Sequence, residues 1–501
     1  MCLFSIKFTK KGGMVINLRK YLSWIIIFSS IFLSVYAEIS VSPRKIDIEQ
    51  FEIDYSETPF VPVVLFDSGS SEVDDYYAPV MKELADRLSE NGDAILEIRG
   101  YYHPQGDGVS GSVRLAKQRA ESVRAKLVEF NSAIQKRIIV EHTPVPTRCI
   151  RGDIGSMNPK IQQENRRVEI SVRTKEEFKL IFENNTPDEI ITQLKETGKL
   201  YLLERLLDDN PLFFALIIFP NSEQDLHNLV EIRNELRDKL KNQISRKRIF
   251  IGLKESVHRD NVEISVCPKW VIHKSIFQNK ITGKIDKNIV KISADDETGI
   301  RVFRQDGYPI ADVVSHWQLS PIPEPTREYY VSGIIPNSSP GTIRRWSKGI
   351  KFGYGMKPKS LSAKMILSNY TIDQLTLSDT PDSYANRDMI ANYIGSLATH
   401  NKKRTIRITI AGYTDHTGDE KKNIQMSEFW AKKEFDYIKR LIPLYLNSKT
   451  EWEEQNGITK YGNLEFTVLG KGTADENHSI SEETGYGRIQ KRRVELQIEI
   501  K

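Results

Sequence analysis

The chain is poor in cysteine and has no spacing typical of a metal site. Its 501 residues include three cysteines, Cys2, Cys149 and Cys267, and nine histidines. No Cys/His pair occurs at the intervals that zinc sites use, so no metal is expected. Cys149 and Cys267 could pair in an oxidising compartment, but sequence does not show whether their Cα atoms come within reach.

The common catalytic and nucleotide-binding motifs are also missing. The sequence contains no Gly-x-x-x-x-Gly-Lys loop, no Gly-x-Gly-x-x-Gly and no His-Glu-x-x-His. Serine, histidine and aspartate are present, but in no arrangement that suggests a nucleophile beside a base. The chain is therefore predicted not to be an enzyme and to need no cofactor.

An apolar run near the N-terminus is typical of a targeting segment. It extends from Tyr21 to Tyr36, with five basic residues and no acidic residue before it. Val35 and Ala37 fit the small-residue positions of a cleavage site, which predicts a signal peptide over residues 1–37. The run is short for a spanning helix, which needs about 20 apolar residues, although an uncleaved anchor remains an alternative. No cysteine stands at the cleavage point, so a lipoprotein is not indicated.

The excess of positive charge belongs to this segment. The chain has 72 basic and 67 acidic residues, and five of the basic residues precede Ala37. Without them the two signs balance, so net charge gives no reason to expect nucleic acid as a partner.

Two distant stretches carry the same landmarks in the same order. The first has Gly100-Tyr101-Tyr102-His103, then Ala116-Lys117-Gln118-Arg119-Ala120, then Asn165-Arg166-Arg167-Val168-Glu169. The second has Gly412-Tyr413-Thr414-Asp415, then Ser427-Glu428-Phe429-Trp430-Ala431, then Lys491-Arg492-Arg493-Val494-Glu495.

Both stretches resemble the OmpA-like, peptidoglycan-associated domain family, over residues ~60–174 and ~365–501. The resemblance implies an α+β fold in which each copy is a βαβαββ two-layer sandwich. It also implies a periplasmic envelope protein, associated with the cell wall and outer membrane, whose partner is peptidoglycan. The predicted domains are a first OmpA-like domain over 38–175, which begins with a polar lead-in at 38–59, and a second over 361–501.

Hydrophobic periodicity predicts the elements of both copies. In the first copy, strands are expected at Val61–Phe66, Ala94–Arg99, Arg137–Val140 and Val168–Val172. Helices are expected around Val80–Leu88 and Ala116–Phe130. In the second copy, helices are expected around Met389–Leu397 and Ala431–Ile442, and strands at Ile406–Ile410, Leu464–Val468 and Val494–Ile500.

The middle of the chain contains a further partial match. The pentapeptide Val-Glu-Ile-Ser-Val occurs at 168–172 and again at 262–266. Either residues 176–266 are a degenerate third copy or the match is a chance recurrence of a good amphipathic strand. Residues 267–360 predict a β-rich spacer with a faint resemblance to immunoglobulin-like sandwiches.

In the family, an Asp and an Arg clamp the diaminopimelate end of the peptidoglycan stem peptide. Fixed negative charge attracts the ligand's ammonium, and the planar guanidinium matches its carboxylate with two parallel hydrogen bonds. The second copy has Asp415, Asn423, Arg492 and Arg493 at matching positions, but Trp430 replaces the clamping Arg. Asp415 alone could instead stabilise its own turn.

The first copy keeps the other half of the clamp. Arg119 holds the Arg position, with Arg166 and Arg167 at the closing basic pair, whereas His103 replaces the Asp and Ser112 the Asn. Asp107 could substitute for the missing carboxylate. Arg119 could alternatively form a surface salt bridge, with Glu121 and Glu164 among its candidate partners.

Two functional hypotheses follow. The first is a non-enzymatic periplasmic protein that binds peptidoglycan through these residues, with two weakened sites acting together by avidity. The second is a scaffold for envelope or outer-membrane proteins, in which the OmpA-like folds have lost wall binding. His103 and Trp430 favour the second hypothesis.

Overall fold

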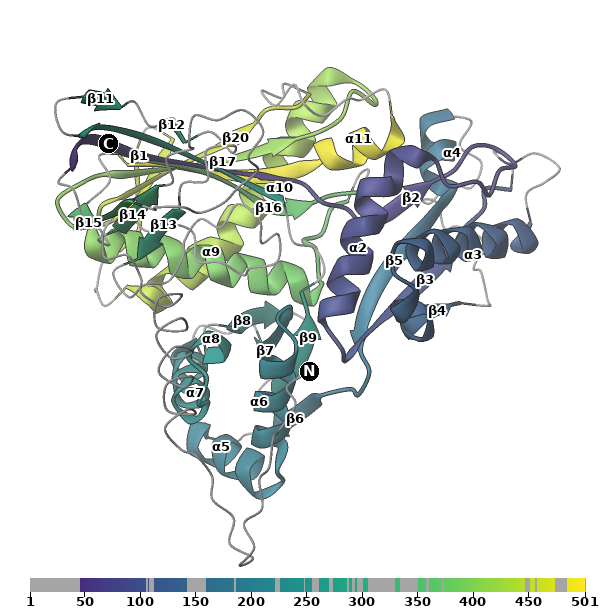
Figure 1. Ribbon diagram of the computed structural model, residues 1–501, viewed down its shortest axis with the longest axis horizontal. Coiled ribbons are helices and arrows are strands. Elements are labelled where there is room, and N and C mark those ends of the chain that lie inside the picture. Colours follow the sequence, from purple (N-terminus) through teal and green to yellow (C-terminus); the bar gives the residue numbers. More distant parts are fainter. Residues whose placement is uncertain are drawn as a thin grey trace, which may run out of the picture.

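The computed structural model has three α/β units arranged around a common junction (Figure 1). It describes residues 46–104, 107, 112–141, 159–183, 186–220, 226–246, 248–254, 261–269, 274–285, 288–290, 293–294, 301–304, 329–333, 350–356, 360–371, 374–446, 451–455, 457–473 and 484–500. The predicted signal peptide at 1–37 and Cys149 lie outside these residues. Within them, Cys267 is a free thiol, and no helix is long and apolar enough to cross a membrane.

The N-terminal unit, residues 63–174, has one four-stranded sheet in the order β2-β5-β3-β4. Its strands are β2 (Val63–Leu65), β3 (Ala94–Gly100), β4 (Ile138–Val140) and β5 (Arg167–Thr174). Its helices are η1 (Asp75–Tyr77), α2 (Ala78–Glu90), α3 (Val113–Phe130), η3 (Ser132–Arg137) and α4 (Pro159–Asn165). The predicted elements are confirmed here, whereas α4 was not expected. Met81, Leu84, Ala120, Val123 and Leu127 are fully buried, as their four- and three-residue spacing predicts.

The middle unit, residues 179–268, repeats this strand order as β6-β9-β7-β8. Its strands are β6 (Lys179–Glu183), β7 (Phe213–Pro220), β8 (Ile249–Lys254) and β9 (Asn261–Pro268). Its helices are α5 (Pro187–Glu196), α6 (Lys199–Asp209), α7 (Leu226–Lys239) and α8 (Gln243–Arg246). In both units the second and third strands are parallel and the last strand is antiparallel to its two neighbours.

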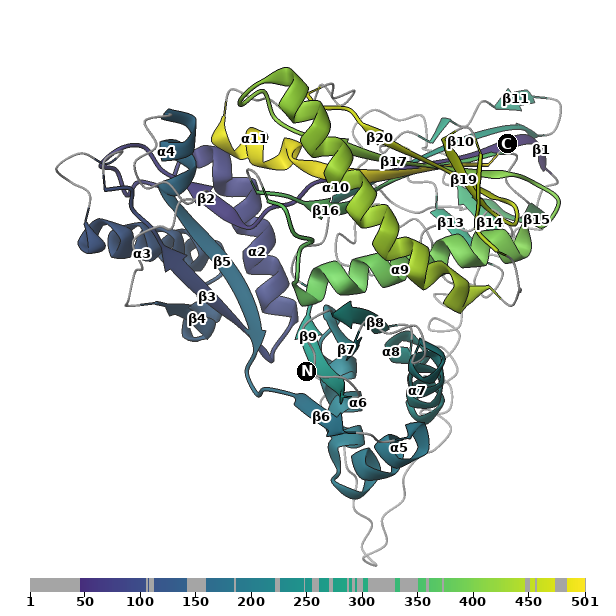
Figure 2. The same ribbon diagram turned by 180° about the vertical axis from the view of Figure 1, so that it is seen from behind.

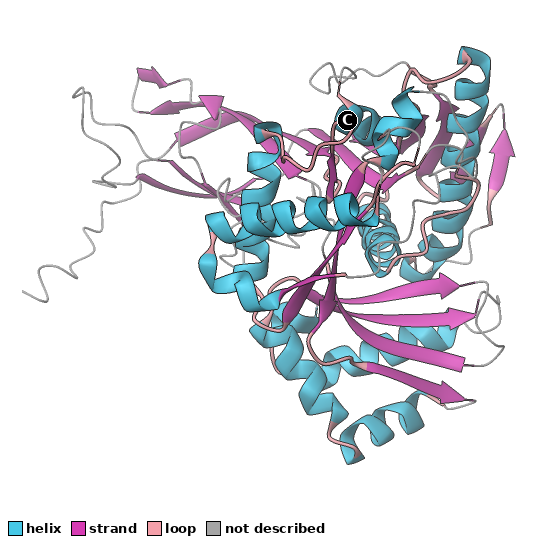
Figure 3. Cartoon of the chain, turned by 90° about the vertical axis from the view of Figure 1, so that its right-hand side faces the viewer, coloured by secondary structure: helices cyan, strands magenta, loops and turns pink. Residues whose placement is uncertain are grey.

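The C-terminal unit, residues 360–500, contains the same order again, as β16-β21-β17-β20. Its strands are β16 (Ser360–Asn369), β17 (Ile406–Tyr413), β18 (Glu453–Gln455), β19 (Ile458–Tyr461), β20 (Leu464–Gly470) and β21 (Arg493–Ile500). Its helices are α9 (Pro381–His400), α10 (Glu420–Leu441), η5 (Ile442–Tyr445) and α11 (Gly485–Lys491). In the side view, helices and strands lie in separate layers (Figure 3).

The residues expected to form a polar lead-in are a long strand of this C-terminal sheet. β1 (Ile46–Thr58) pairs parallel to β16 and antiparallel to β10 (Lys274–Ile285). Residues 46–58, expected to be part of a polar lead-in to the first domain, are instead a strand of another unit's sheet. The first strand of the described chain is therefore part of a sheet whose other main strands come from the C-terminal part of the chain.

Part of the predicted β-rich spacer also belongs to the C-terminal sheet. Besides β10, the short strands β11 (Asn288–Val290) and β12 (Ser293–Ala294) extend this sheet. A separate antiparallel sheet contains β13 (Arg301–Arg304), β14 (Tyr329–Gly333) and β15 (Ile350–Met356). The region is β-rich as expected, but its described strands are divided between this separate sheet and the C-terminal sheet.

The middle unit is fastened to the C-terminal unit along the edge strand β8. Figure 2 shows α9 between the C-terminal sheet and the middle unit. The backbone N–H of Ile251 donates to the carboxylate of Asp388 (3.0 Å), and that of Leu253 donates to the hydroxyl of Tyr437 (2.8 Å). These bonds satisfy donors that an unpaired edge would otherwise leave without partners.

Candidate ligand-binding sites

Each of the two predicted sites is built around a glycine at the end of a strand. A Cβ atom on Gly100 would lie 1.9 Å from the carbonyl oxygen of Ala116, and a Cβ on Gly412 would lie 1.9 Å from that of Ser427. In both units the strand end therefore approaches the following helix so closely that no side chain fits. This contact positions the loop that carries the site residues over the first turns of α3 or α10.

The second arginine of each closing pair, Arg167 or Arg493, makes the same two contacts within its own unit. The guanidinium of Arg167 lies over the ring of Tyr101 (4.6 Å) and its Nε donates to Glu169 (2.8 Å). Arg493 repeats this arrangement in the C-terminal unit. It lies over the ring of Tyr413 (4.7 Å), and its Nε donates to Glu495 (2.6 Å). Both guanidinium groups stack on a tyrosine and pair with the glutamate two residues on, and their expected role in binding a ligand stays a prediction.

In the N-terminal unit, Arg119 is paired with Asp107. Two hydrogen bonds, of 2.6 and 3.0 Å, join the guanidinium to the carboxylate, and neither side chain is exposed. The remaining donors of Arg119 reach the carbonyl oxygens of Ser70 (2.8 Å), Tyr101 (3.0 Å) and Asp67 (2.9 Å). The carboxylate of Asp107 faces Arg119, so the hypothesis that it replaces the missing Asp toward a ligand stays a prediction.

The carboxylate of Asp107 also accepts two backbone hydrogen bonds. The N–H of Gly69 donates to it at 3.0 Å and that of His103 at 2.7 Å. Burial by itself opposes the charge, but the hydrogen bonds from Arg119 and the two amides outweigh it and lower the pKa of Asp107. The site is thus a carboxylate-binding cradle made of one guanidinium and two amides.

The other predicted residues of this site lie around the cradle. His103 is 1 % exposed, and its burial lowers its pKa, which favours the neutral imidazole. Arg166 is half-buried, and its Nε donates to the carbonyl oxygen of Phe66 (3.1 Å). Ser112, at the position of the family's Asn, is the N-cap of α3 and accepts from the N–H of Leu115 (3.2 Å).

In the C-terminal unit, Asp415 is held by Arg492. These two side chains form a buried ion pair, and the other edge of the Arg492 guanidinium donates to both carboxylate oxygens of Glu164, at 3.1 and 2.7 Å. Glu164 lies at the end of α4 in the N-terminal unit. Burial opposes the charge of Arg492, but the attraction of Glu164 and Asp415 raises its pKa. All three side chains are nearly inaccessible, at 1–3 % exposed.

The partners expected for Arg119 are therefore engaged elsewhere. Glu164 binds Arg492 across the boundary between units, and Glu121 forms an exposed pair with Arg124 on α3 (3.3 Å). Arg119 does form a salt bridge, but the pair is buried and not on the surface as that alternative expected, and its partner is Asp107. Nothing in local periodicity could have joined Glu164 to Arg492, because they belong to different units.

Two further C-terminal landmarks have well-defined contacts. The side-chain amide of Asn423 donates to the carbonyl oxygen of Asp415 (3.2 Å), so Asn423 supports the loop that carries the carboxylate. Trp430, which stands at the position of the family's Arg, is 2 % exposed and stacks on Tyr370 at 4.7 Å. Its Nε1 donates to the carbonyl oxygen of Gln374 (2.6 Å). Trp430 is thus a core residue, and the guanidinium beside Asp415 comes from Arg492.

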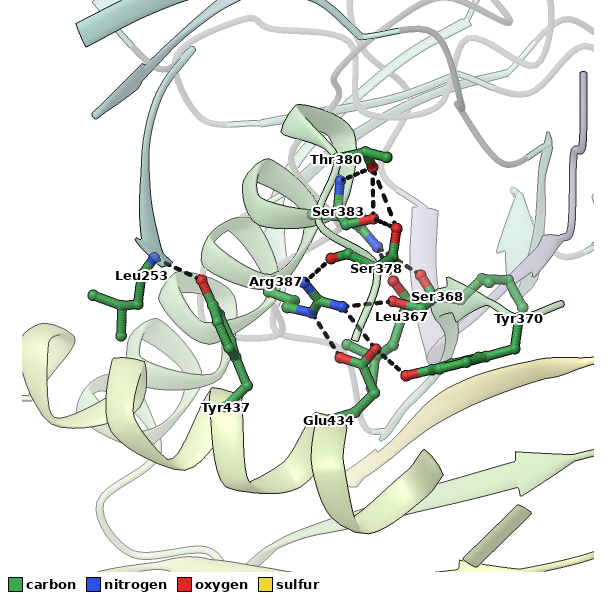
Figure 4. A network of polar contacts seen from close by, with 12 residues as sticks. Leu253, Leu367, Ser368, Tyr370, Ser378, Thr380, Ser383, Arg387, Glu434 and Tyr437 are labelled. Carbon is green, nitrogen blue, oxygen red and sulfur yellow. Dashed lines mark hydrogen bonds and ion pairs between the residues drawn. The ribbon is translucent and has the colours of Figure 1, made fainter. Parts of the chain in front are cut away.

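A second buried ion pair joins the helices behind this site (Figure 4). Arg387 on α9 donates to Glu434 on α10 at 2.7 and 2.9 Å, and neither side chain is exposed. The hydroxyl of Tyr370 donates to the same carboxylate (2.6 Å). Burial opposes the charge of Glu434, but Arg387 outweighs it and the pKa is lowered. This network was not predicted from the sequence, and its complete pairing indicates a structural role.

Around Arg492, α11 forms a continuous contact with the N-terminal unit. The hydroxyl of Tyr486 donates to the carbonyl oxygen of Val61 (3.0 Å), and the amide of Gln490 donates to that of Pro59 (2.8 Å). Arg488 donates to the side chain of Gln163 (2.7 Å). Figure 1 shows α11 extending from the C-terminal sheet toward α4 and β2. Within the described ranges, no three His, Cys, Asp or Glu side chains gather so as to hold a metal ion.

Comparison with known proteins finds a family match in the N-terminal unit. Residues 65–143 match the model of the OmpA family. Curated proteins include no match to the chain. The expected OmpA-like domain is thus found once, and the further copies remain predictions.

Several solved structures are similar to part of the chain. The peptidoglycan-associated lipoprotein from Burkholderia pseudomallei is 20% identical, with 22% of this chain and 89% of that chain covered and a TM-score of 0.19. The cell wall anchor of the T6SS from Pseudomonas aeruginosa is 25% identical, with coverages of 22% and 76% and a TM-score of 0.19. The periplasmic domain of Helicobacter pylori MotB is 18% identical, with coverages of 26% and 80% and a TM-score of 0.20.

Proposed function

We propose that this chain is a non-enzymatic envelope protein that binds peptidoglycan through its N-terminal unit. The match of residues 65–143 to the OmpA family supports the proposal. The periplasm, at the cell wall and beneath the outer membrane, is the compartment in which such binding takes place. The ligand is the stem peptide, whose diaminopimelate carries both an ammonium and a carboxylate.

The observation that carries the proposal is the cradle around Asp107. Arg119 presents two parallel donors, and the amides of Gly69 and His103 add two more, all directed at one carboxylate. A charge-assisted hydrogen bond contributes about 1.5–3 kcal/mol, so four donors make a strong carboxylate site. In this proposal the carboxylate of the stem peptide takes the place that Asp107 fills in the structure.

The repeated strand order supports an origin of the three units by duplication of one domain. The N-terminal and middle units have the strand order first-last-second-third, and the C-terminal sheet contains the corresponding run β16-β21-β17-β20 with the same strand directions. We propose that they derive from one OmpA-like sandwich by duplication, with domains at 38–175, 176–266 and 361–501. β1 is then an addition to the last domain, although it lies at the start of the first domain's range.

Sedimentation with purified sacculi tests the proposed function in the full chain. The carboxylate of Asp107 competes with the ligand, so Asp107→Asn is expected to raise the bound fraction severalfold. Arg119→Lys keeps the charge but loses the planar fork, and is expected to lower it. Arg124→Lys, on the same helix α3 but exposed, is the matched control. If neither wild type nor Asp107→Asn sediments with sacculi, the proposal is wrong.

A second candidate function is a protein scaffold, which the Glu164–Arg492 contact favours. This contact uses the C-terminal site to join two units of one chain, which is a structural and not a wall-binding use. In that case the three units form a platform for envelope or outer-membrane proteins. The sedimentation assay separates the two functions, because a scaffold of this kind leaves the sacculi unbound in every variant.

A further inference from the structure

The C-terminal site carries opposite charges at fixed positions. Asp415 supplies a carboxylate, and Arg492, on the other side, supplies a guanidinium whose outer edge faces Glu164. A site of this kind matches a zwitterionic amino-acid head group, with the ammonium beside Asp415 and the carboxylate on Arg492. Two hydroxyl oxygens in the loop, on Thr414 and Thr417, are buried without a hydrogen-bond partner among the described atoms. They are polar groups available to a ligand.

Glu164 already holds the place of the ligand's carboxylate. Both of its oxygens accept from Arg492, in the two-bond geometry that a free carboxylate would use. The Nε of Arg492 donates to the carbonyl oxygen of Tyr370 (3.3 Å), so the Nε side of the guanidinium is also occupied. A ligand carboxylate can therefore reach this guanidinium only after Glu164 has left it.

We propose that Glu164 is an internal occupant of the C-terminal site, and that a zwitterionic amino-acid head group bound between Asp415 and Arg492 displaces it and releases α11 from the N-terminal unit. The identification of that head group with diaminopimelate rests on the proposed function. The displacement itself rests on the geometry around Arg492.

The neighbouring contacts explain why displacement of Glu164 would weaken the contact between α11 and the N-terminal unit. Tyr486, Gln490 and Arg488 join α11 to the N-terminal unit through hydrogen bonds to Val61, Pro59 and Gln163. Glu164 also lies 3.6 Å from Arg488 of α11, so its bond to Arg492 is the shorter of two ion pairs that Glu164 makes in this interface. Departure of Glu164 from both arginines leaves α11 with neutral acceptors, so the interface opens more often while each unit keeps its own core.

Glu164→Gln in the full chain tests the proposal, with meso-diaminopimelate as the probe. The neutral amide competes less well for Arg492, so calorimetry should show binding at least tenfold tighter than in wild type. The gain should vanish in Glu164→Gln combined with Asp415→Asn. Glu121→Gln, which removes a carboxylate from an exposed pair, should bind as wild type does. An affinity within twofold of wild type, or a gain that survives the loss of Asp415, would overturn the proposal.

Hydrogen exchange of the wild-type chain gives a second measurement, independent of any destabilised variant. Saturating meso-diaminopimelate should speed exchange of the amides of α4 and α11 severalfold and leave those of α7 unchanged. Unchanged exchange in α4 and α11 at saturation would exclude the displacement. Sacculus binding is scored separately through Arg119, so its failure would count against the proposed function and not against displacement of Glu164.

Discussion

Arg119 and Asp107 form a two-bond ion pair in which neither side chain is exposed to solvent. Removal of either partner alone destabilises the fold, because the other is left as an uncompensated buried charge. Arg119 makes the cradle a carboxylate-binding site, and Asp107 already fills it. The contact that stabilises the folded unit therefore also blocks a ligand carboxylate from reaching Arg119.

Arg119→Ala is expected to destabilise the N-terminal unit by about 3–5 kcal/mol, because Asp107 stays buried without a counter-ion. Hydrogen exchange of α3 amides under increasing urea measures the change in that unit. Arg124→Ala, whose side chain is 34 % exposed and forms only a 3.3 Å pair with Glu121, should change it by less than about 1 kcal/mol. Equal effects of the two substitutions would contradict the importance of the buried pair.

The pH dependence of stability should report Asp107. Its pKa is lower in the folded chain than its ordinary value of 3.8. As the pH falls below about 4, the unfolded carboxylate takes up a proton before the folded one does, which favours unfolding. Stability of the N-terminal unit should therefore be constant above that range and fall below it. Urea titrations at several pH values should show a shallower fall in Asp107→Asn, and an identical fall would argue against the shift.

The two strand-end glycines should tolerate no side chain. A methyl group at Gly100 or Gly412 would overlap a backbone carbonyl oxygen of the next helix, at 1.9 Å in each case. Separating the strand from the helix disrupts the core, so Gly100→Ala and Gly412→Ala should each cost more than about 3 kcal/mol. A methyl group at Gly92 would meet no atom within 4 Å, so Gly92→Ala is the control. Thermal melts that fail to separate the three variants would refute this close approach.

Asp388→Ala should loosen the middle unit from α9. The substitution removes the acceptor of the Ile251 amide and leaves Arg233, 3.9 Å away, without its buried carboxylate. The expected cost is about 3 kcal/mol or more. Exchange of the Ile251 and Leu253 amides should become at least tenfold faster. Asp436→Ala, at an exposed position of α10, should leave both amides protected; if Asp388→Ala does so as well, α9 does not secure the edge.

Periodicity is sufficient to predict the elements that bury one face. The four- and three-residue spacing of Ala116, Ala120 and Val123 locates α3, and the alternation of Ile406, Ile408 and Ile410 locates β17. β1 escapes prediction although its sequence contains a comparable signal. Apolar residues alternate up to Ile48 and again from Phe51, and the change of phase between them coincides with a register shift in its pairing with β10. A β-bulge thus interrupts the pattern.

The site residues can be identified by position but not by contact. Arg119, Asp415 and Arg492 lie where the landmarks place them, at strand ends and helix starts. Their partners are beyond sequence reasoning for different reasons. Asp107 reaches Arg119 through the path of a loop, and Glu164 reaches Arg492 only because two units dock. The position of Trp430 suggests a replaced ligand contact, whereas its stacking on Tyr370 is a packing interaction that spacing cannot distinguish.

The position of β1 has a consequence for synthesis of the chain. β1 leaves the ribosome among the first described residues, but its partner β10 follows about 200 residues later and its partner β16 about 300 residues later. Until β10 emerges, β1 is an unpaired strand that another chain or a chaperone can bind. A fragment that begins after β1 leaves the β16 edge open in the same way. β1 and β16 must therefore both be present before the C-terminal sheet can assemble completely.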